Sequence, residues 1–268
     1  MKRNERNIFL ILCGVLTAVV VLLIGGNIGV IVFRGLGALP GHLMERETQF
    51  ALWMSVKSAC ISTLLCILLA VPTAYTLSRG RFPLRGALET LLELTMSLPY
   101  IVLGLSLLIL FSSPAGKWLK AAGFPVVFSS NGVILAQLVV NLPFAIRLVS
   151  TAFQSVDRKL EYVAGLLGAS PVRQFFWVLL PMCRRSLLSA VILVWSRALG
   201  EFGATLMLVG VTRMKTETLP ASIYLAVSGN DLDSALASAF LLLLISAVSL
   251  GLANYMARRG RKRGRYDG

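Results

Sequence analysis

The chain has 268 residues, of which 56% are hydrophobic and only 14% are charged, a composition too apolar for a soluble domain of this length. Its formal net charge of +14 would suit a nucleic-acid-binding protein, but the basic residues are distributed beside apolar segments, which argues against one. The sequence also lacks the short alternating segments of a membrane β-barrel, so we expect an all-α, polytopic membrane protein.

Six segments are apolar and long enough to cross a bilayer, which takes about 20 residues. They lie at residues 8–33, 50–78, 87–111, 131–152, 185–209 and 234–257. The first is longer than the apolar core of a secretion signal, so we expect an uncleaved helix. We therefore expect one transmembrane domain over residues 1–268, with an even number of spans and both termini on one side of the membrane.

The basic residues define which side that is. With the N-terminus in the cytoplasm, 18 of the 26 Lys and Arg residues fall on the cytoplasmic side, as the positive-inside rule requires. They are Lys2, Arg3, Arg6, Arg79, Arg81, Arg85, Arg147, Arg158, Lys159, Arg173, Arg184, Arg185, Arg258, Arg259, Arg261, Lys262, Arg263 and Arg265. The last six of these residues form a basic C-terminal tail, which we expect to contact lipid and no nucleic acid.

Polar residues and prolines interrupt several spans. Lys57 lies in the second span, where it either snorkels to the surface or offers a passing anion a positive charge. Pro99 interrupts the third span, and Asn141 with Pro143 interrupts the fourth. Such breaks free backbone groups that neighbours or water must satisfy, so each predicts either kinked packing or a gate hinge.

Arg197 and Glu201 are two charges within the fifth apolar segment, where charge is expensive and usually functional. Their four-residue spacing predicts a shared helix face on which they neutralise each other. We expect a structural or gating bridge, with direct contact to a passing ion as the alternative.

Residues 153–184 form a less apolar connection between the fourth and fifth spans, which we call the docking segment. Apolar residues recur at helical spacing over 160–167 and again over 172–179. Between them, Gly168 can end one helix in the left-handed conformation, Ser170 can cap the next, and Pro171 can occupy its first turn. A helix-turn-helix at the membrane surface predicts a surface that a partner grips; a helix pair lying on lipid is the alternative.

Several catalytic functions are excluded. The chain has no G-x-x-x-x-G-K-[ST] phosphate loop, so we expect it to hydrolyse no ATP itself. Its single histidine, His42, and its four cysteines show no metal-ligand spacing, and no catalytic cluster is evident. We expect neither an enzyme nor a metal site.

The docking segment resembles the cytoplasmic loop of binding-protein-dependent ABC importer permeases, whose pattern is EAA, Gly, nine residues, then Ile-x-Leu-Pro. Here nine residues separate Gly168 from Val178, and Leu180-Pro181 follow; Ala164 matches, Tyr162 stands where the family usually has Glu, and Glu161 is one residue early. In that family the loop docks on an ATPase subunit. The resemblance assigns docking to Glu161, Tyr162, Ala164, Gly165, Gly168, Ala169, Ser170 and Pro181.

A second stretch resembles the oxyanion permeases of this group, molybdate and tungstate importers first and sulfate/thiosulfate permeases next. It comprises RALGEFGATLMLVG at 197–210 and Thr-Glu-Thr-Leu-Pro at 216–220. We assign the pathway or gate to Arg197, Glu201, Thr205, Pro99, Asn141 and Lys57.

The resemblance implies a type I, molybdate-like permease fold in a prokaryotic cell membrane. It implies a second copy of the chain, two ATP-binding subunits that hold ATP and Mg²⁺, and an extracytoplasmic oxyanion-binding protein, while this chain binds no cofactor. The alternatives are another ABC permease substrate, such as sulfate or phosphate, and an ATPase-independent carrier that uses Glu201 as a proton-linked site.

Overall fold

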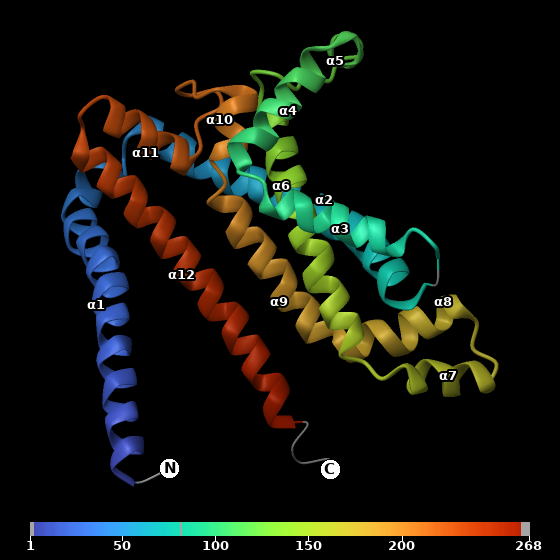
Figure 1. Cartoon of the computed structure of the whole chain (residues 1–268). Coiled ribbons are helices and arrows are strands. Elements are labelled where there is room, and N and C mark those ends of the chain that lie inside the picture. Colours follow the sequence, from blue (N-terminus) through green and yellow to red (C-terminus); the bar gives the residue numbers. More distant parts are fainter. Residues whose placement is uncertain (1–2, 81, 264–268) are drawn as a thin grey trace.

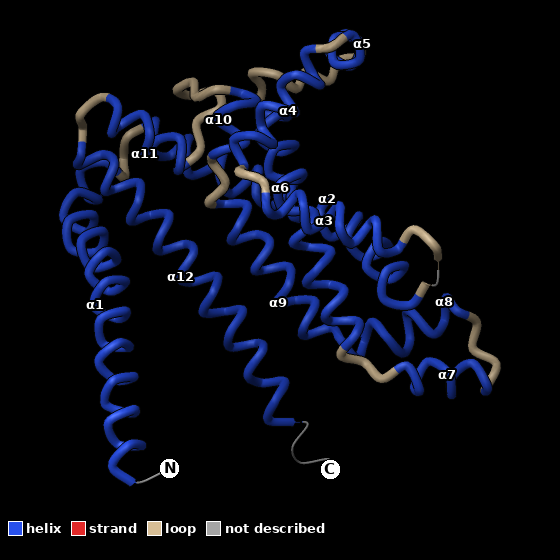
Figure 2. Tube along the Cα trace, in the orientation of Figure 1, coloured by secondary structure: helices blue, strands red, loops and turns tan. Residues whose placement is uncertain are grey.

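A computed structural model describes residues 3–80 and 82–263, with side chains described for residues 7–80 and 82–255. The described chain is helical without strands, and short loops join the helices (Figures 1 and 2). Lys2, Arg81 and Arg265, and the side chains of the other basic residues near both ends, lie outside what is described. The helices are α1 Arg3–His42, α2 Arg46–Arg79, α3 Arg85–Ser97, α4 Tyr100–Ser112, α5 Pro114–Ala121, α6 Ser130–Gln154, α7 Arg158–Leu166, α8 Pro171–Arg173, the π-helix η1 Gln174–Leu179, α9 Leu180–Leu199, α10 Gly203–Val209, α11 Leu219–Ser228 and α12 Leu232–Arg263.

Five helical segments are long and apolar enough to span a membrane, and a bent pair makes a sixth. The expected spans at 8–33, 50–78, 131–152 and 234–257 correspond to α1, α2, α6 and α12. In Figure 1 the start of α1, the end of α12 and helix α7 all lie at the lower end of the molecule, as an even number of crossings requires.

The third and fifth expected spans were wrong as single helices. Residues 87–111 are split between α3 and α4, which are bent by 108° at Leu98–Pro99. Residues 185–209 are split at Gly200–Phe202, where α9 ends and α10 begins in a new direction. The fifth span instead extends backward, because α8, η1 and α9 form one apolar helical run, Pro171–Leu199.

The expected interruption of the fourth span does not occur. Helix α6 runs continuously through Asn141 and Pro143, both of which are buried. Asn141 Nδ2 donates to the Gln137 carbonyl at 2.8 Å, one turn earlier in the same helix. A proline in a helix leaves a backbone carbonyl without its usual N–H partner, which is costly where the helix faces lipid. Because Pro143 is buried in the protein, the helix continues through it.

Helices α2 and α6 form the most extensive helix pair of the fold, and polar side chains join them. Gln137 accepts from the Ser62 hydroxyl at 3.0 Å and donates to Ser58 Oγ at 3.1 Å. All three side chains are buried. In a membrane, where lipid is as apolar as a leucine side chain, such hydrogen bonds and small residues hold helices together.

Gly104 allows α4 to touch α10. A Cβ at this position would lie 2.5 Å from the Ala204 carbonyl oxygen and 2.6 Å from Ala204 Cα, both of which are backbone atoms. The close approach brings α10 into the apolar core formed with α6, in which Leu208 and Val133 are fully buried.

We expect Gly104→Ala to destabilise the protein by about 1–3 kcal/mol, the usual cost of overpacking. Gly86→Ala in α3 is the matched control, because nothing lies within 4 Å of its added Cβ. Thermal unfolding followed by tryptophan fluorescence compares the two. A midpoint for Gly104→Ala equal to that of Gly86→Ala would contradict the close approach.

Candidate functional site: the docking segment and the helix crossing beneath it

The turn within the docking segment has the predicted conformation. Gly168 has φ +87°, and the Ala169 N–H donates to the Ala164 carbonyl at 3.0 Å, which closes the last turn of α7. The Ser170 hydroxyl then accepts from the Arg173 N–H at 3.4 Å, and Pro171 opens α8. The predictions for Gly168, Ser170 and Pro171 are confirmed.

Gly168→Ala should cost about 1–2 kcal/mol, because a left-handed conformation brings a Cβ too close to the following carbonyl. Gly168→Asn should cost less, since asparagine tolerates this region. Limited proteolysis of the turn and thermal unfolding measure the effect. Gly251→Ala in α12, where the added Cβ also meets nothing, is the control; equal behaviour of the two alanine variants would refute the conformational argument.

The second half of the docking segment is not the separate short helix that the sequence predicted. After α8, η1 runs directly into α9, and its Phe175 ring packs edge-on against Tyr75 and Phe153 at centroid distances of 5.1 and 6.0 Å. These rings join η1 to α2 and α6. The second half of the docking segment is therefore the beginning of the fifth span, so displacement of this half must also displace α9.

Glu161 lies on the inward side of α7, where it pairs with Arg79 at the end of α2. The distance from Arg79 Nη2 to Glu161 Oε1 is 2.6 Å, and each side chain is only 10% exposed. Arg79 also donates to the Phe153 and Val156 carbonyls at 2.9 and 3.1 Å. Arg158 at the start of α7 donates to the Ser78 carbonyl. These contacts tie the first half of the docking segment to α2.

Glu161 lies one residue before the position at which the family usually has its acidic residue, and this shift changes the direction that the acid faces. Glu161 faces its own chain, while Tyr162, which stands at the usual position of the acid, is 69% exposed. The sequence identified Arg79 only as a topology signal after the second span, and its pairing with Glu161 across 82 residues of chain could not be inferred from spacing.

Gly165 and Gln174 pack the two halves of the docking segment together. Gln174 Nε2 donates to the Ala169 carbonyl at 2.9 Å, and a Cβ at Gly165 would lie 2.9 Å from the same nitrogen. Pro181 is the second residue of α9, directly after η1. The two halves of the docking segment are therefore in contact, and Leu166 and Leu167 of the first half are exposed.

The expected bridge between Arg197 and Glu201 is absent, and that prediction was wrong. Helix α9 ends at Leu199, so the two residues do not share a helix face, and no ion pair among the described residues joins them. Instead the Arg197 guanidinium lies over the rings of Phe144 and Tyr100, 4.8 and 5.4 Å from their centroids. Cation–π contacts of this kind stabilise a guanidinium away from water.

Glu201 caps α10. Its carboxylate accepts from the Ala204 N–H at 2.8 Å, from the Thr205 N–H at 3.2 Å and from the Thr205 hydroxyl. Because the first N–H groups of a helix have no partner within it, a carboxylate at this position satisfies them and complements the helix dipole. Glu201 and Thr205 are both buried, so their pattern in the sequence reflects a structural cap.

The remaining pathway candidates are dispersed. Pro99 precedes α4 at the bend, directly before Tyr100, and so lies near Arg197. Asn141 is fully buried within α6, and its Oδ1 has no hydrogen-bond partner among the described residues. Lys57 is exposed on α2. The crossing of α4, α6 and α9 therefore collects Arg197, Tyr100 and Phe144, of which the sequence identified only the arginine.

The Thr216–Pro220 stretch is folded inward against α2. Residues 216–220 are all buried, and the Leu219 N–H donates to Ser55 Oγ at 2.7 Å. Glu217 accepts from the Met214 N–H at 3.1 Å, and burial raises the pKa of its carboxyl. This stretch therefore positions α11 against α2.

A family described as "Binding-protein-dependent transport system inner membrane component" matches residues 62–262. Among solved structures, a bacterial alginate ABC transporter in complex with an alginate pentasaccharide-bound periplasmic protein aligns with a TM-score of 0.74 at 16% identity, covering 96% of both chains. The inward-facing MetNI methionine ABC transporter aligns with a TM-score of 0.66 at 17% identity, covering 82% of this chain and 98% of that one. At these identities the structures support the fold.

Curated relatives are more similar in sequence. The molybdenum transport system permease protein ModB of Mycobacterium tuberculosis is 40% identical over 204 residues, 75% of this chain and 77% of that protein. A probable molybdenum ABC transporter permease protein of Haloferax volcanii is 36% identical over 255 residues, 95% and 91% of the two chains. The sulfate transport system permease protein CysW of Escherichia coli K12 is 32% identical over 228 residues, 84% and 78%. The chain therefore belongs to the family of binding-protein-dependent transport system inner membrane components.

Proposed function

We propose that this chain is the membrane-spanning subunit of an ATP-driven importer for a tetrahedral oxyanion, molybdate or tungstate. The observation that carries the mechanism is the docking segment, a helix-turn-helix tied to α2 and continuous with α9. The substrate class rests on the 40% and 36% identity to molybdenum permeases. An ATPase-independent carrier has no use for such a segment, and Glu201 is a helix cap with no free carboxylate oxygen for a proton relay.

The outer face of α7 supports docking of a partner protein. Tyr162, Leu166 and Leu167 are 69%, 70% and 85% exposed. Exposed apolar groups clustered on one short helix are typical of a protein interface. We propose that α7 sits in a groove on an ATP-binding subunit, with Tyr162 in place of the usual acid and Glu161 positioning the helix from behind.

The proposed assembly has two copies of the chain, two ATP-binding subunits that hold ATP and Mg²⁺, and an extracytoplasmic binding protein. Both termini and the docking segment lie in the cytoplasm of a prokaryotic cell, consistent with the positive-inside distribution. ATP binding would close the ATPases, move α7 and open the pathway outward, and hydrolysis would reset it. Lys57, Pro99 and Asn141 remain candidates for the pathway or its hinges.

The substrate is tested by ATP hydrolysis in proteoliposomes that contain the chain, its ATPase and its binding protein. Stimulation by molybdate and tungstate but not sulfate is the expected result. Stimulation by sulfate alone would transfer the substrate to the second candidate, which the 32% identity to a sulfate permease supports.

The docking surface is tested separately with the double variant Leu166→Ser/Leu167→Ser, which we expect to lose co-purification of the ATPase. Leu84→Ser is the matched control, because Leu84 is 69% exposed and follows α2 at the same end of the molecule. If the double variant retains the ATPase as fully as the control, α7 lies on lipid and the docking assignment fails.

A further inference from the structure

The π-helix η1, Gln174–Leu179, lies at the joint between the docking segment and the fifth span. The Leu180 N–H donates to the Phe175 carbonyl, five residues earlier, whereas an α-helix joins residues four apart. The turn therefore holds one residue more than an α-helical turn would. Within residues 3–80 and 82–263, η1 is the only π-helix.

The proline that follows η1 favours the wide turn but does not fully account for it. In an α-helix the Pro181 ring would clash with the Trp177 carbonyl, and Pro181 has no N–H to donate. Helices α2 and α6 nevertheless continue through Pro72 and Pro143 as α-helices. The wide turn is thus a feature of this joint, and such turns are frequent at functional sites.

The side chains of η1 are packed on one side only. Phe175 packs edge-on against Tyr75 of α2 at a centroid distance of 5.1 Å, and Leu179 is fully buried in the same core. Phe176 and Trp177 are 57% and 81% exposed. Packing therefore attaches η1 to the core on its inner side and leaves its outer side open.

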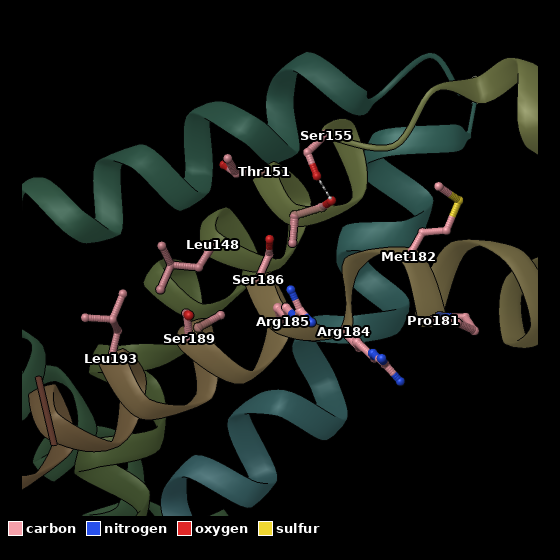
Figure 3. A pocket seen from close by; sticks show the side chains of 12 residues that line it. Leu148, Thr151, Ser155, Pro181, Met182, Arg184, Arg185, Ser186, Ser189 and Leu193 are labelled. Atoms are coloured by element: carbon pink, nitrogen blue, oxygen red, sulfur yellow. Dashed lines mark hydrogen bonds between the residues drawn. The ribbon is translucent and has the colours of Figure 1, made fainter. Parts of the chain in front are cut away.

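A hollow of about 680 Å³ begins where η1 ends, between α6 and the first turns of α9 (Figure 3). Pro181 and Met182 border it, as do Arg184 and Arg185, and Figure 3 shows Leu193 at the far end. A close-packed interior resists rotation of a helix, because its side chains interdigitate with their neighbours. The hollow gives the first turns of α9 room to rotate against α6.

The extra residue of η1 provides a way to make that rotation. When such a turn moves along a helix, each N–H exchanges its acceptor in succession, so few hydrogen bonds are broken at one time. The stretch that the turn passes rotates by about 100° and shifts by about 1.5 Å, the values for one residue of an α-helix. Pro181 lowers the cost of this exchange, since it has no N–H bond to break.

We propose that η1 is a hinge, which lets the first turns of α9 rotate into the adjacent hollow when the docking segment is displaced. The Glu161–Arg79 pair and the Phe175 contacts join the docking segment to α2 and α6, so these parts form one side of the hinge. The first turns of α9 form the other side. The inference rests on the proposed function for the ATP-driven displacement of the docking segment.

Hydrogen–deuterium exchange tests the hinge in the wild-type chain assembled with its ATPase in nanodiscs. The nucleotide-free complex is compared with the complex trapped by ATP and vanadate. We expect the amides of residues 174–182 to exchange about tenfold faster in one state than in the other, because their hydrogen bonds are redistributed. Residues 137–149 of α6, which continue through Pro143, are the internal control and should differ less than about twofold. Equal exchange of residues 174–182 in the two states would refute the hinge.

A second experiment removes the extra residue. Deletion of Trp177 makes η1 an α-helical turn, with a proline inside the helix as at Pro72 and Pro143. Trp177→Ala loses the same side chain but keeps the residue, so it is the matched control. With the ATPase and the molybdate-loaded binding protein in proteoliposomes, we expect the deletion to lower stimulated ATP hydrolysis about tenfold and the control to lower it less than about twofold.

Equal stimulation of the deletion variant and the control would overturn the hinge. If the deletion variant does not bind the ATPase, the exchange measurement on the wild type decides, since it needs neither the variant nor the oxyanion. ATPase association is scored in every sample. Failure of the proposed function is therefore seen as a wild type that binds no ATPase or shows no stimulation, separately from the behaviour of η1.

Discussion

Arg79→Ala is expected to destabilise the protein by about 3–5 kcal/mol and to abolish ATP-driven transport, because it leaves the Glu161 carboxylate buried without its partner. The variant also removes two donors from the Phe153 and Val156 carbonyls, where the chain leaves α6 for α7. Of the polar contacts described between α7 and α2, only the one from Arg158 to the Ser78 carbonyl would remain, so movement of a docked subunit would be transmitted poorly to α2. Thermal unfolding and ATPase stimulation in proteoliposomes measure the two effects.

The conservative partner change separates the charge pair from the backbone contacts. In Glu161→Gln, Arg79 keeps both carbonyl acceptors, so we expect a smaller loss of stability than in Arg79→Ala. Arg213→Gln is the matched control, since Arg213 pairs with Glu47 at the opposite end of α2 with side chains 56% and 46% exposed. An exposed pair contributes about 0–1 kcal/mol. Equal effects of Arg79→Ala and Arg213→Gln would overturn the assignment of a buried tie between α7 and α2.

Glu201→Ala is expected to cost about 2–6 kcal/mol, because it strands two buried backbone donors, Ala204 N–H and Thr205 N–H, at about 1–3 kcal/mol each. Glu201→Gln should be intermediate, since its amide oxygen still accepts while its nitrogen cannot. Glu201→Ala should impair folding and assembly more than Glu201→Gln does. Neither variant should change the preference between molybdate and sulfate. Thermal unfolding, together with transport assays of whatever complex assembles, measures these outcomes.

Glu93→Gln is the control for this series, because Glu93 is an exposed helical acid and its replacement should change stability by less than about 0.5 kcal/mol. A Glu201→Gln variant with wild-type stability and assembly but altered anion preference would restore the ion-contact role and disprove the cap. Lys57, which is exposed on α2, is not expected to share the effect.

Local chemistry was sufficient to predict the docking turn. Gly168 adopts the left-handed conformation and Ser170 caps α8 because both features depend on a few consecutive residues and their own backbone. The spans α1, α2, α6 and α12 were also predictable from the sequence. A span needs an apolar run as long as the bilayer is thick, and tertiary contacts do not change that length.

The breaks in the helices and the partners of the buried charges could not be predicted from the sequence, because they depend on contacts between distant segments. Pro143 remains inside α6 because buried neighbours surround it, whereas Pro99 separates two helices bent by 108°. Glu201 caps α10 because α9 ends two residues earlier, at Leu199. The predicted pairing of Glu201 with Arg197 assumed that one helix contains both residues.

By itself the sequence determined the membrane class and the docking turn, because each follows from composition or from short-range spacing, while the family was indicated by the resemblance of two motifs. Only the tertiary structure decided that Glu161 faces Arg79, that Arg197 lies over Tyr100 and Phe144, and that Arg184 and Arg185 border a hollow. The physical reason is that a buried charge takes the partner that packing brings to it, and packing joins residues far apart in the chain.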